Sequence, residues 1–211
     1  MTELLLSDPA DATALLMLAH GAGAPMTSPF METMAKLLAE RAIATARFEF
    51  AYMAARRIAG KRRPPPRAEL LKAEYETAVA STRELARGRL LLIGGKSLGG
   101  RVATLVAGRL HADGAVSGLV CLGYPFHPPA KPDALRTAHL VELACPALIV
   151  QGERDPFGSR GEVEAYPLSP AIRIHWAPDG DHDLGPRGAS GFTRRGNLEA
   201  AADAVARFAR A

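Results

Sequence analysis

The chain has 211 residues, of which 48% are hydrophobic and 23% are charged, and its formal net charge is +4. This balance is typical of a globular protein with a sizeable core, so we expect a single domain over residues 1–211 rather than a disordered or repetitive chain. No apolar run approaches the roughly 20 residues of a membrane-spanning helix, which argues against a membrane protein.

Short apolar runs alternate with segments of helical periodicity along the chain. The apolar runs predict strands at residues 14–21, 45–50, 89–95, 118–125, 146–155 and 172–178. The helical periodicity predicts helices at residues 30–42, 68–88, 98–110 and 197–210. Strands that are apolar throughout and separated by helices imply an α/β fold, with a mostly parallel central sheet covered by helices on both faces. Ligands of such sheets bind at the carboxyl ends of the strands.

The N-terminus and the cysteines favour a cytoplasmic setting. The first twenty residues lack the basic start of a signal peptide, and Asp8 and Asp11 interrupt their apolar runs. Cys121 and Cys145 make neither a disulfide framework nor a metal-ligand cluster. We expect no metal and no cofactor.

Basic residues gather in one proline-rich segment without an acidic residue. They are Arg56, Arg57, Lys61, Arg62, Arg63 and Arg67. Without these six residues the net charge of +4 would become −2, so the chain is not basic throughout and nucleic-acid binding is not indicated. Two interpretations stay open. The segment is a solvated loop, or it anchors an anionic substrate such as a carboxylate or a phosphate ester, with Tyr52 lining the pocket and Arg56, Lys61 and Arg62 contacting the anion.

The stretch "LLIGGKSLGG", residues 91–100, sets one hydroxyl between glycines at the end of an apolar run. A phosphate-binding loop would need a glycine at position 90, where Leu90 stands. Gly95, Ser97 and Gly99 instead match G-x-S-x-G, the strand–turn–helix motif that exposes a nucleophilic serine. The tight turn strains the backbone at the serine, and the flanking glycines let the helix fold back against the strand. We expect Lys96 to be solvated or paired at the rim, without a catalytic role.

A serine nucleophile needs a base, and the base needs an orienting acid. In this fold the expected chain order is serine, acid, histidine. Asp155 ends a predicted strand and His182 lies in the loop "GDHDL" after another, so both follow Ser97 in the required order. Asp181 and Asp183 flank the histidine and are expected to hold its loop.

An acyl-transfer site also needs amide donors for the oxyanion. The Leu98 N–H, directly after the nucleophile, is one candidate. The second is expected from the loop "HGAGAP", residues 20–25, where Ala22 is favoured and Gly23 is next. His127 in "GYPFHPP" is expected to line the site.

Seven motifs in one order carry a resemblance to a known family. They are "HGAG", "PFM", "GKRRPPPR", "GGKSLGGRVA", "LGYPFHPP", "LIVQGERDPFG" and "GDHDL". From about residue 15 onward the chain resembles the small α/β-hydrolases typified by the eukaryotic testis-expressed and NSL-complex hydrolase-like proteins and their bacterial relatives, and is similar to the dienelactone-hydrolase-like group. The resemblance implies an α/β-hydrolase fold without a separate lid domain, with Ser97, Asp155 and His182 on the family's triad. The resemblance does not identify a substrate, and some eukaryotic relatives serve in complexes rather than as enzymes.

We therefore expect a serine hydrolase that acts on small to medium carboxylic esters or thioesters, including anionic ones. The connection from Gly123 to Cys145 is short, so the site should be open, which argues against a lipase for long acyl chains. The alternative is a non-catalytic hydrolase-like module that binds a protein partner. That hypothesis predicts an intact fold with an unreactive Ser97.

Overall fold

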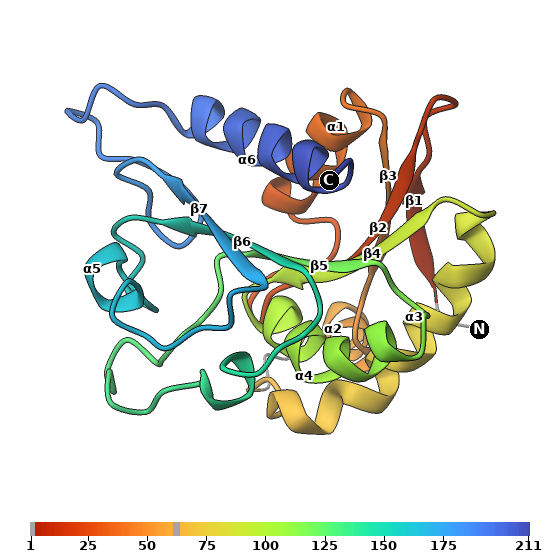
Figure 1. Cartoon of the computed structure of the whole chain (residues 1–211), viewed down its shortest axis with the longest axis horizontal. Coiled ribbons are helices and arrows are strands. Elements are labelled where there is room, and N and C mark those ends of the chain that lie inside the picture. The colour runs from red at the N-terminus through yellow and green to blue at the C-terminus, as the bar shows by residue number, and fades with distance from the viewer. Residues whose placement is uncertain (1–2, 61–63) are drawn as a thin grey trace.

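A seven-stranded sheet forms the centre of the computed structural model, which describes residues 3–60 and 64–211 (Figure 1). The strands are β1 (Leu4–Ser7), β2 (Ala14–Ala19), β3 (Ile43–Phe48), β4 (Leu90–Lys96), β5 (Gly118–Leu122), β6 (Ala147–Gly152) and β7 (Ile172–Ala177). Their order in the sheet is β1-β3-β2-β4-β5-β6-β7. Only β1 pairs antiparallel, with β3, and the other neighbours are parallel.

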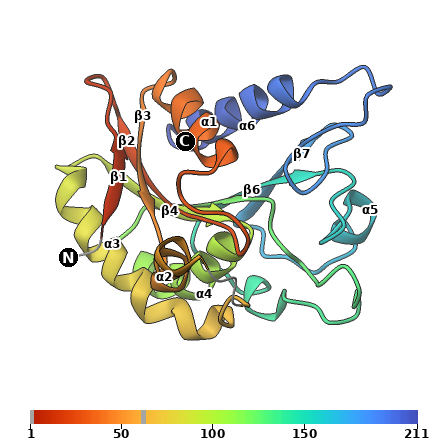
Figure 2. The same cartoon turned by 180° about the vertical axis from the view of Figure 1, so that it is seen from behind.

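Helices cover both faces of this sheet, as Figures 1 and 2 show. One face carries α1 (Pro29–Ala39) and α6 (Arg194–Phe208), and the other carries α2 (Ala51–Ala59), α3 (Lys72–Ala86) and α4 (Leu98–Ala112). The short α5 (Arg160–Val163) follows β6, and single 3₁₀ turns lie at Ala68–Leu71 and Ala138–Leu140. The expected α/β fold, with a mostly parallel sheet and no separate lid domain, is confirmed.

The apolar strands are explained by burial on both faces. Every residue of β2 is buried. Leu15 and Met17 pack into the core under α3 and α4, whereas Leu16 and Leu18 pack under α1 and α6. Because side chains alternate along a strand, one apolar run supplies both cores.

The register of the strands brings several loops to one edge of the sheet. Ala19 at the end of β2 pairs with Gly95 of β4, and Lys96 pairs with Leu122 at the end of β5. The loops that follow β2, β4, β6 and β7 therefore meet at this carboxyl edge, where the sequence predicts the site.

Three strands or helices differ from the prediction. The edge strand β1 and the short helix α5 were not expected, because four residues are too few to give a clear periodic signal. The start of the basic segment was expected as a loop, but Arg56 lies in α2, which ends at the left-handed Gly60 (φ 67°). Residues 61–63 lie outside the described part of the chain.

Within residues 3–60 and 64–211, no helix combines the length and the apolar composition that crossing a membrane requires. Cys121 and Cys145 are both buried as free thiols.

Candidate active site

Ser97 occupies the turn between β4 and α4 in a strained backbone conformation. Its φ is 51° and its ψ is −112°, a region that residues with a side chain rarely adopt. Its N–H donates to the Leu122 carbonyl oxygen (3.1 Å), and its own carbonyl accepts the Arg101 N–H (2.9 Å) that begins α4. These two hydrogen bonds fix the backbone before and after Ser97 and so maintain its strained conformation.

Glycines make this turn possible because the backbones approach each other closely. A Cβ atom at Gly99 would lie 2.5 Å from the Ala19 carbonyl oxygen, and one at Gly95 would lie 2.6 Å from the same atom. Both contacts are with backbone, which cannot move aside cheaply. The requirement for glycine at these two positions, inferred from the motif, has a direct steric cause.

Ser97, His182 and Asp155 form a chain of hydrogen bonds across three loops. The Ser97 Oγ lies 2.9 Å from His182 Nε2, and His182 Nδ1 lies 2.7 Å from Asp155 Oδ2. Because the carboxylate only accepts, the proton of the neutral imidazole resides on Nδ1. Nε2 is then free to accept the Ser97 hydroxyl proton, which is the arrangement that a general base requires.

Asp155 is fully buried, and two further donors satisfy its carboxylate. Oδ1 accepts the Phe157 N–H (2.8 Å), and Oδ2 also accepts an N–H of the Gln151 side chain (2.9 Å). A buried carboxylate needs such partners, because burial without them is costly. The Phe157 ring packs on the His182 imidazole with centroids 4.3 Å apart, which covers the ring from one side.

The loop that carries His182 is braced by its own aspartates. Asp181 Oδ1 accepts the N–H groups of Asp183 (2.9 Å) and Gly185 (2.8 Å), as expected for a residue that holds the loop. Asp179 accepts three N–H groups of Arg187, from the backbone (2.7 Å), from Nε (2.9 Å) and from Nη2 (2.5 Å). These bonds to Arg187 lower the pKa of the Asp179 carboxyl to about 2.

His20 orients the loop after β2, where the second oxyanion donor was predicted. Its Nε2 accepts the Phe50 N–H (3.1 Å), so Nδ1 carries the proton and donates to the Gly21 carbonyl (2.6 Å). In a trans peptide the N–H points away from the C=O, so the Ala22 N–H is directed away from His20. Neither the Ala22 amide nor the Leu98 amide hydrogen-bonds to another described part of the chain, which leaves both available to a ligand.

The other predicted binding residues lie in different surroundings. Tyr52 Oη donates to the Ala22 carbonyl (3.4 Å), and Arg56 Nη1 donates to the Gly23 carbonyl (3.3 Å). Both side chains therefore contact the backbone of the loop, and neither is part of the lining of the pocket beside Ser97. His127 is buried, with Nδ1 at 3.0 Å from the Pro128 carbonyl oxygen, and it does not line the pocket beside Ser97. Lys61 and Arg62 lie outside the described residues.

A pocket of about 470 Å³ opens beside Ser97. Its lining comes from four segments of the chain and consists of Gly21, Ala22, Gly23, Ala24, Ser28, Pro29, Phe30, Met31, Lys96, Ser97, Phe157, His182, Asp183 and Arg194. Pro29, Phe30 and Arg194 also line a groove of about 540 Å³ between α1 and α6. The pocket therefore continues into this groove.

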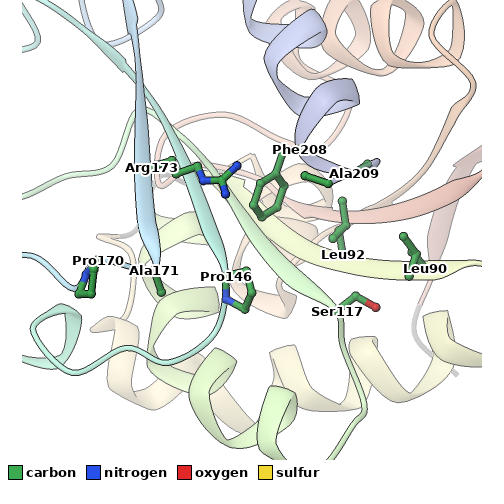
Figure 3. A pocket seen from close by; sticks show the side chains of 10 residues that line it. Leu90, Leu92, Ser117, Pro146, Pro170, Ala171, Arg173, Phe208 and Ala209 are labelled. Carbon is green, nitrogen blue, oxygen red and sulfur yellow. The ribbon is translucent and has the colours of Figure 1, made fainter.

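A second cavity, of about 420 Å³, lies at the opposite edge of the sheet (Figure 3). Residues at or just before the amino ends of β4, β5, β6 and β7 form its walls together with the end of α6, and Arg173 is the one charged side chain drawn there. None of the three hydrogen-bonded residues lines this cavity, so we place the site at the carboxyl edge.

Sequence reasoning missed three contributors to the site. Gln151 could have been noticed, because it is a polar residue inside an apolar strand. Phe157 lies in the quoted "ERDPFG", but no role was predicted for it. Arg194 had none, because α6 follows a long loop and only the fold brings its first residue to the pocket. Within residues 3–60 and 64–211, no group of three or more His, Cys, Asp or Glu side chains is arranged to hold a metal ion.

Comparisons with solved structures place this geometry in a known architecture. Est1E from Butyrivibrio proteoclasticus is similar with a TM-score of 0.70 and 14% identity, over 98% of this chain and 93% of that chain. Dienelactone hydrolase from Anabaena variabilis ATCC 29413 has a TM-score of 0.70 and 23% identity, over 96% and 88%. XC6422 from Xanthomonas campestris, described as an α/β serine hydrolase without lid, has a TM-score of 0.68 and 16% identity, over 96% and 88%.

At these identities the solved structures support the fold rather than a shared activity. The family is assigned from the sequence instead. The family model described as "Alpha/beta hydrolase domain" matches residues 12–210, a range that contains the strained serine turn and both of its hydrogen-bonded partners. The chain therefore belongs to the alpha/beta hydrolase domain family.

Proposed function

We propose that the protein is a serine hydrolase that cleaves carboxylic esters or thioesters of small to medium size. The observation that carries the proposal is the unbroken hydrogen-bond chain from Ser97 through His182 to the buried Asp155. A surface serine gains nothing from a strained turn, whereas a nucleophile gains an exposed hydroxyl aimed at a base.

In the proposed mechanism Ser97 Oγ attacks the ester carbonyl carbon while its proton moves to His182 Nε2. Asp155 stabilises the imidazolium that forms. The amides of Leu98 and Ala22 donate to the oxyanion of the tetrahedral intermediate, and losing one such donor typically costs about 3 kcal/mol of transition-state stabilisation.

Collapse of the intermediate breaks the bond to the leaving oxygen or sulfur, which takes the proton from His182. Water then gives a proton to His182 and attacks the acyl carbon. The second tetrahedral intermediate releases the carboxylic acid and returns the proton to Ser97 Oγ.

Within the ester class we favour substrates that carry a negative charge. The Arg194 side chain lines the pocket beside Ser97 and makes no hydrogen bond or close ion pair with another described residue, although its charge acts on the Asp183 carboxylate through space. Lys96, the other cation of the lining, is paired with Asp183 (3.1 Å). A guanidinium whose hydrogen-bond donors are unused is well suited to a carboxylate or phosphate group of the substrate.

The names of relatives are compatible with this substrate class. Est1E has been solved with ferulic acid bound, and another similar protein is named a dienelactone hydrolase. The motifs quoted above further support a place among the testis-expressed and NSL-complex hydrolase-like proteins.

The decisive experiment is labelling with a fluorophosphonate probe, in which a reactive serine displaces fluoride from phosphorus. We expect the wild-type chain to be labelled and Ser97→Ala to remain unlabelled, because the histidine that Ser97 contacts is oriented by a buried carboxylate. A panel of p-nitrophenyl esters of increasing acyl length would then measure the size of the pocket. A folded wild-type protein that resists the probe would contradict the proposal and favour the non-catalytic module.

A further inference from the structure

Lys96, the residue directly before Ser97, has a buried ammonium group. Its side chain is 8% exposed, although a lysine at this position was expected at the rim. Its Nζ donates to the main-chain carbonyl of His182 (2.9 Å) and pairs with Asp183 Oδ1 (3.1 Å). The same Nζ lies 5.3 Å from the centre of the Phe30 ring.

These contacts join three segments around one side chain. The Lys96 backbone ends β4 beside the nucleophile, its two oxygen partners lie in the loop of the histidine, and Phe30 lies in the first turn of α1. The aliphatic stem passes Gly21, where a Cβ atom would lie 3.6 Å from Lys96 Cγ. One side chain therefore touches the turn, the oxyanion loop and the histidine loop.

Gly123 leaves room for this arrangement. With a φ of 67° it follows β5, and a Cβ atom there would lie 3.2 Å from Lys96 Nζ and 3.3 Å from His182 Nδ1. Lys96 Nζ and the imidazole therefore share one small space. A larger residue at position 123 would press against both.

Stability alone does not account for a buried ammonium. Burial lowers the pKa of Lys96, which means that its charged form is held at a cost that the Asp183 carboxylate partly offsets. A buried ion pair of this kind is often no more stabilising than an apolar pair of the same size. The advantage must then lie in what the ammonium orients.

We infer that Lys96 is a positioning residue, which fixes the main chain at His182 so that Nε2 stays within hydrogen-bond distance of Ser97 Oγ. The inference rests on the proposed function. Asp155 holds the ring at Nδ1, and Lys96 holds the backbone that carries the ring. With both ends fixed, the imidazole has little freedom to swing away from the nucleophile.

Lys96→Met keeps most of the stem and removes the charge and the donor. We expect kcat for p-nitrophenyl butyrate and the rate of fluorophosphonate labelling to fall by about 10- to 100-fold, because small displacements of a catalytic group have effects of this size. KM should stay within about twofold, since Lys96 is not proposed to bind the ester. The exposed Lys131→Met is the matched control and should leave both parameters unchanged.

A second variant separates positioning from folding. Lys96→Cys treated with 2-bromoethylamine gains an ammonium at nearly the length of lysine, as the thiolate displaces bromide. The same variant treated with 1-bromopropane gains a neutral chain of equal length that has no hydrogen-bond donor. Cys121 and Cys145 are buried and burial raises the pKa of both thiols, so treated wild type should keep its activity. We expect the aminoethyl form to recover most of kcat and the propyl form to stay low.

The outcomes separate this inference from the proposed function. Labelling of Lys96→Met at the wild-type rate, or equal activity of the two alkylated forms, would overturn the positioning role while leaving the serine hydrolase intact. A wild-type chain that does not react with the probe would overturn the proposed function and this role with it. A lower melting temperature in Lys96→Met with full aminoethyl recovery of kcat would still support the inference.

Discussion

Ser97 shows how a single residue depends on neighbours that have no side chain. Its positive φ and the close approach of Ala19 to α4 are two aspects of one tight reversal. The turn persists because the strands beneath it are buried and paired on both sides. The clearest test at this scale therefore changes a glycine rather than the serine.

Gly99→Ala should disrupt the turn. The added Cβ would lie 2.5 Å from the Ala19 carbonyl oxygen, so the helix or the strand must shift. We expect a loss of about 1–3 kcal/mol in the free energy of unfolding, as in other overpacked sites, and a loss of fluorophosphonate labelling. Urea unfolding followed by circular dichroism measures the first effect.

Gly108→Ala in the same helix is the matched control. A Cβ atom there meets only Leu143 Cδ1 at 3.9 Å, an ordinary contact. We expect this variant to gain about 0.5–1 kcal/mol, because alanine favours a helix over glycine, and to label at the wild-type rate. Equal effects of the two substitutions would contradict the steric explanation.

The sequence could indicate Ser97, Asp155 and His182 because the chemistry of acyl transfer imposes residue types, chain order and a local glycine spacing. The structure brings the three together, while their catalytic roles stay a proposal. The burial of Lys96 could not be foreseen. Its partners are 86 and 87 positions further along the chain, and nothing local distinguishes a paired lysine from a solvated one.

At the scale of elements, the connection between β7 and α6 decides where the histidine lies. Asp179 braces its start through Arg187 and through Arg154, whose Nε lies 2.8 Å from Asp179 Oδ1. In the unfolded chain the Asp179 pKa returns toward its ordinary value of 3.8, above the folded value of about 2. As pH falls the unfolded state then takes up the proton first, so stability is present above about pH 4 and is lost toward pH 2.

Asp179→Asn should remove this part of the acid dependence. We expect the urea midpoint of the variant to lie below that of the wild type at pH 7 and to approach it between pH 4 and pH 2. A series of urea titrations from pH 7 to pH 2 gives the comparison. A constant difference between the two proteins across this range would contradict the assignment.

Arg194 at the start of α6 should set the charge preference of the pocket. We expect mono-p-nitrophenyl esters of dicarboxylic acids to be hydrolysed with a higher kcat/KM than neutral esters of matched length. Arg194→Gln should lower this preference about fivefold, the effect of roughly 1 kcal/mol that an exposed ion pair contributes.

Arg195→Gln is the control for Arg194, because Arg195 already pairs with Glu199 (2.8 Å) and lies in the groove rather than the pocket. Neutral esters should react equally with all three proteins. A charge preference that survives Arg194→Gln would place the anion elsewhere, for example near the basic segment.

Most elements could be predicted because buried parallel strands and amphipathic helices have strong periodic patterns. The predicted strand at 45–50 is observed at Ile43–Phe48, a shift that reflects how weakly composition marks the ends of a strand. The next element, α2, was not predicted as a helix, because the arginines and prolines from residue 56 onward favour a loop. α2 exists because Tyr52 and Met53 pack toward the core, a tertiary effect that local composition does not contain.

Across the whole molecule, stability is not evenly distributed over the sheet. β5 and β6 are buried along their full length, whereas β7 is an edge strand with only Ala177 fully buried. The loop that carries His182 is thus attached to an edge strand that is only partly buried. Local opening is expected to begin where few apolar contacts hold the backbone.

The single tryptophan, Trp176, lies in β7 and reports on this edge. We expect its fluorescence to change at lower urea than the far-UV circular dichroism signal, and labelling of Ser97 to be lost together with the fluorescence. Coincident midpoints for all three probes would instead show that the sheet unfolds as one cooperative unit.

The order of the strands also has a consequence for biosynthesis. A ribosome delivers the oxyanion loop and Ser97 first, Asp155 later, and His182 only after β7, while α6 still waits to cover its face of the sheet. Under the mechanism we propose, a nascent chain therefore carries its nucleophile for 85 residues before the base arrives. On that proposal the Ser97 hydroxyl has no base to activate it during this interval, so the unfinished chain would have no hydrolytic activity before its architecture is complete.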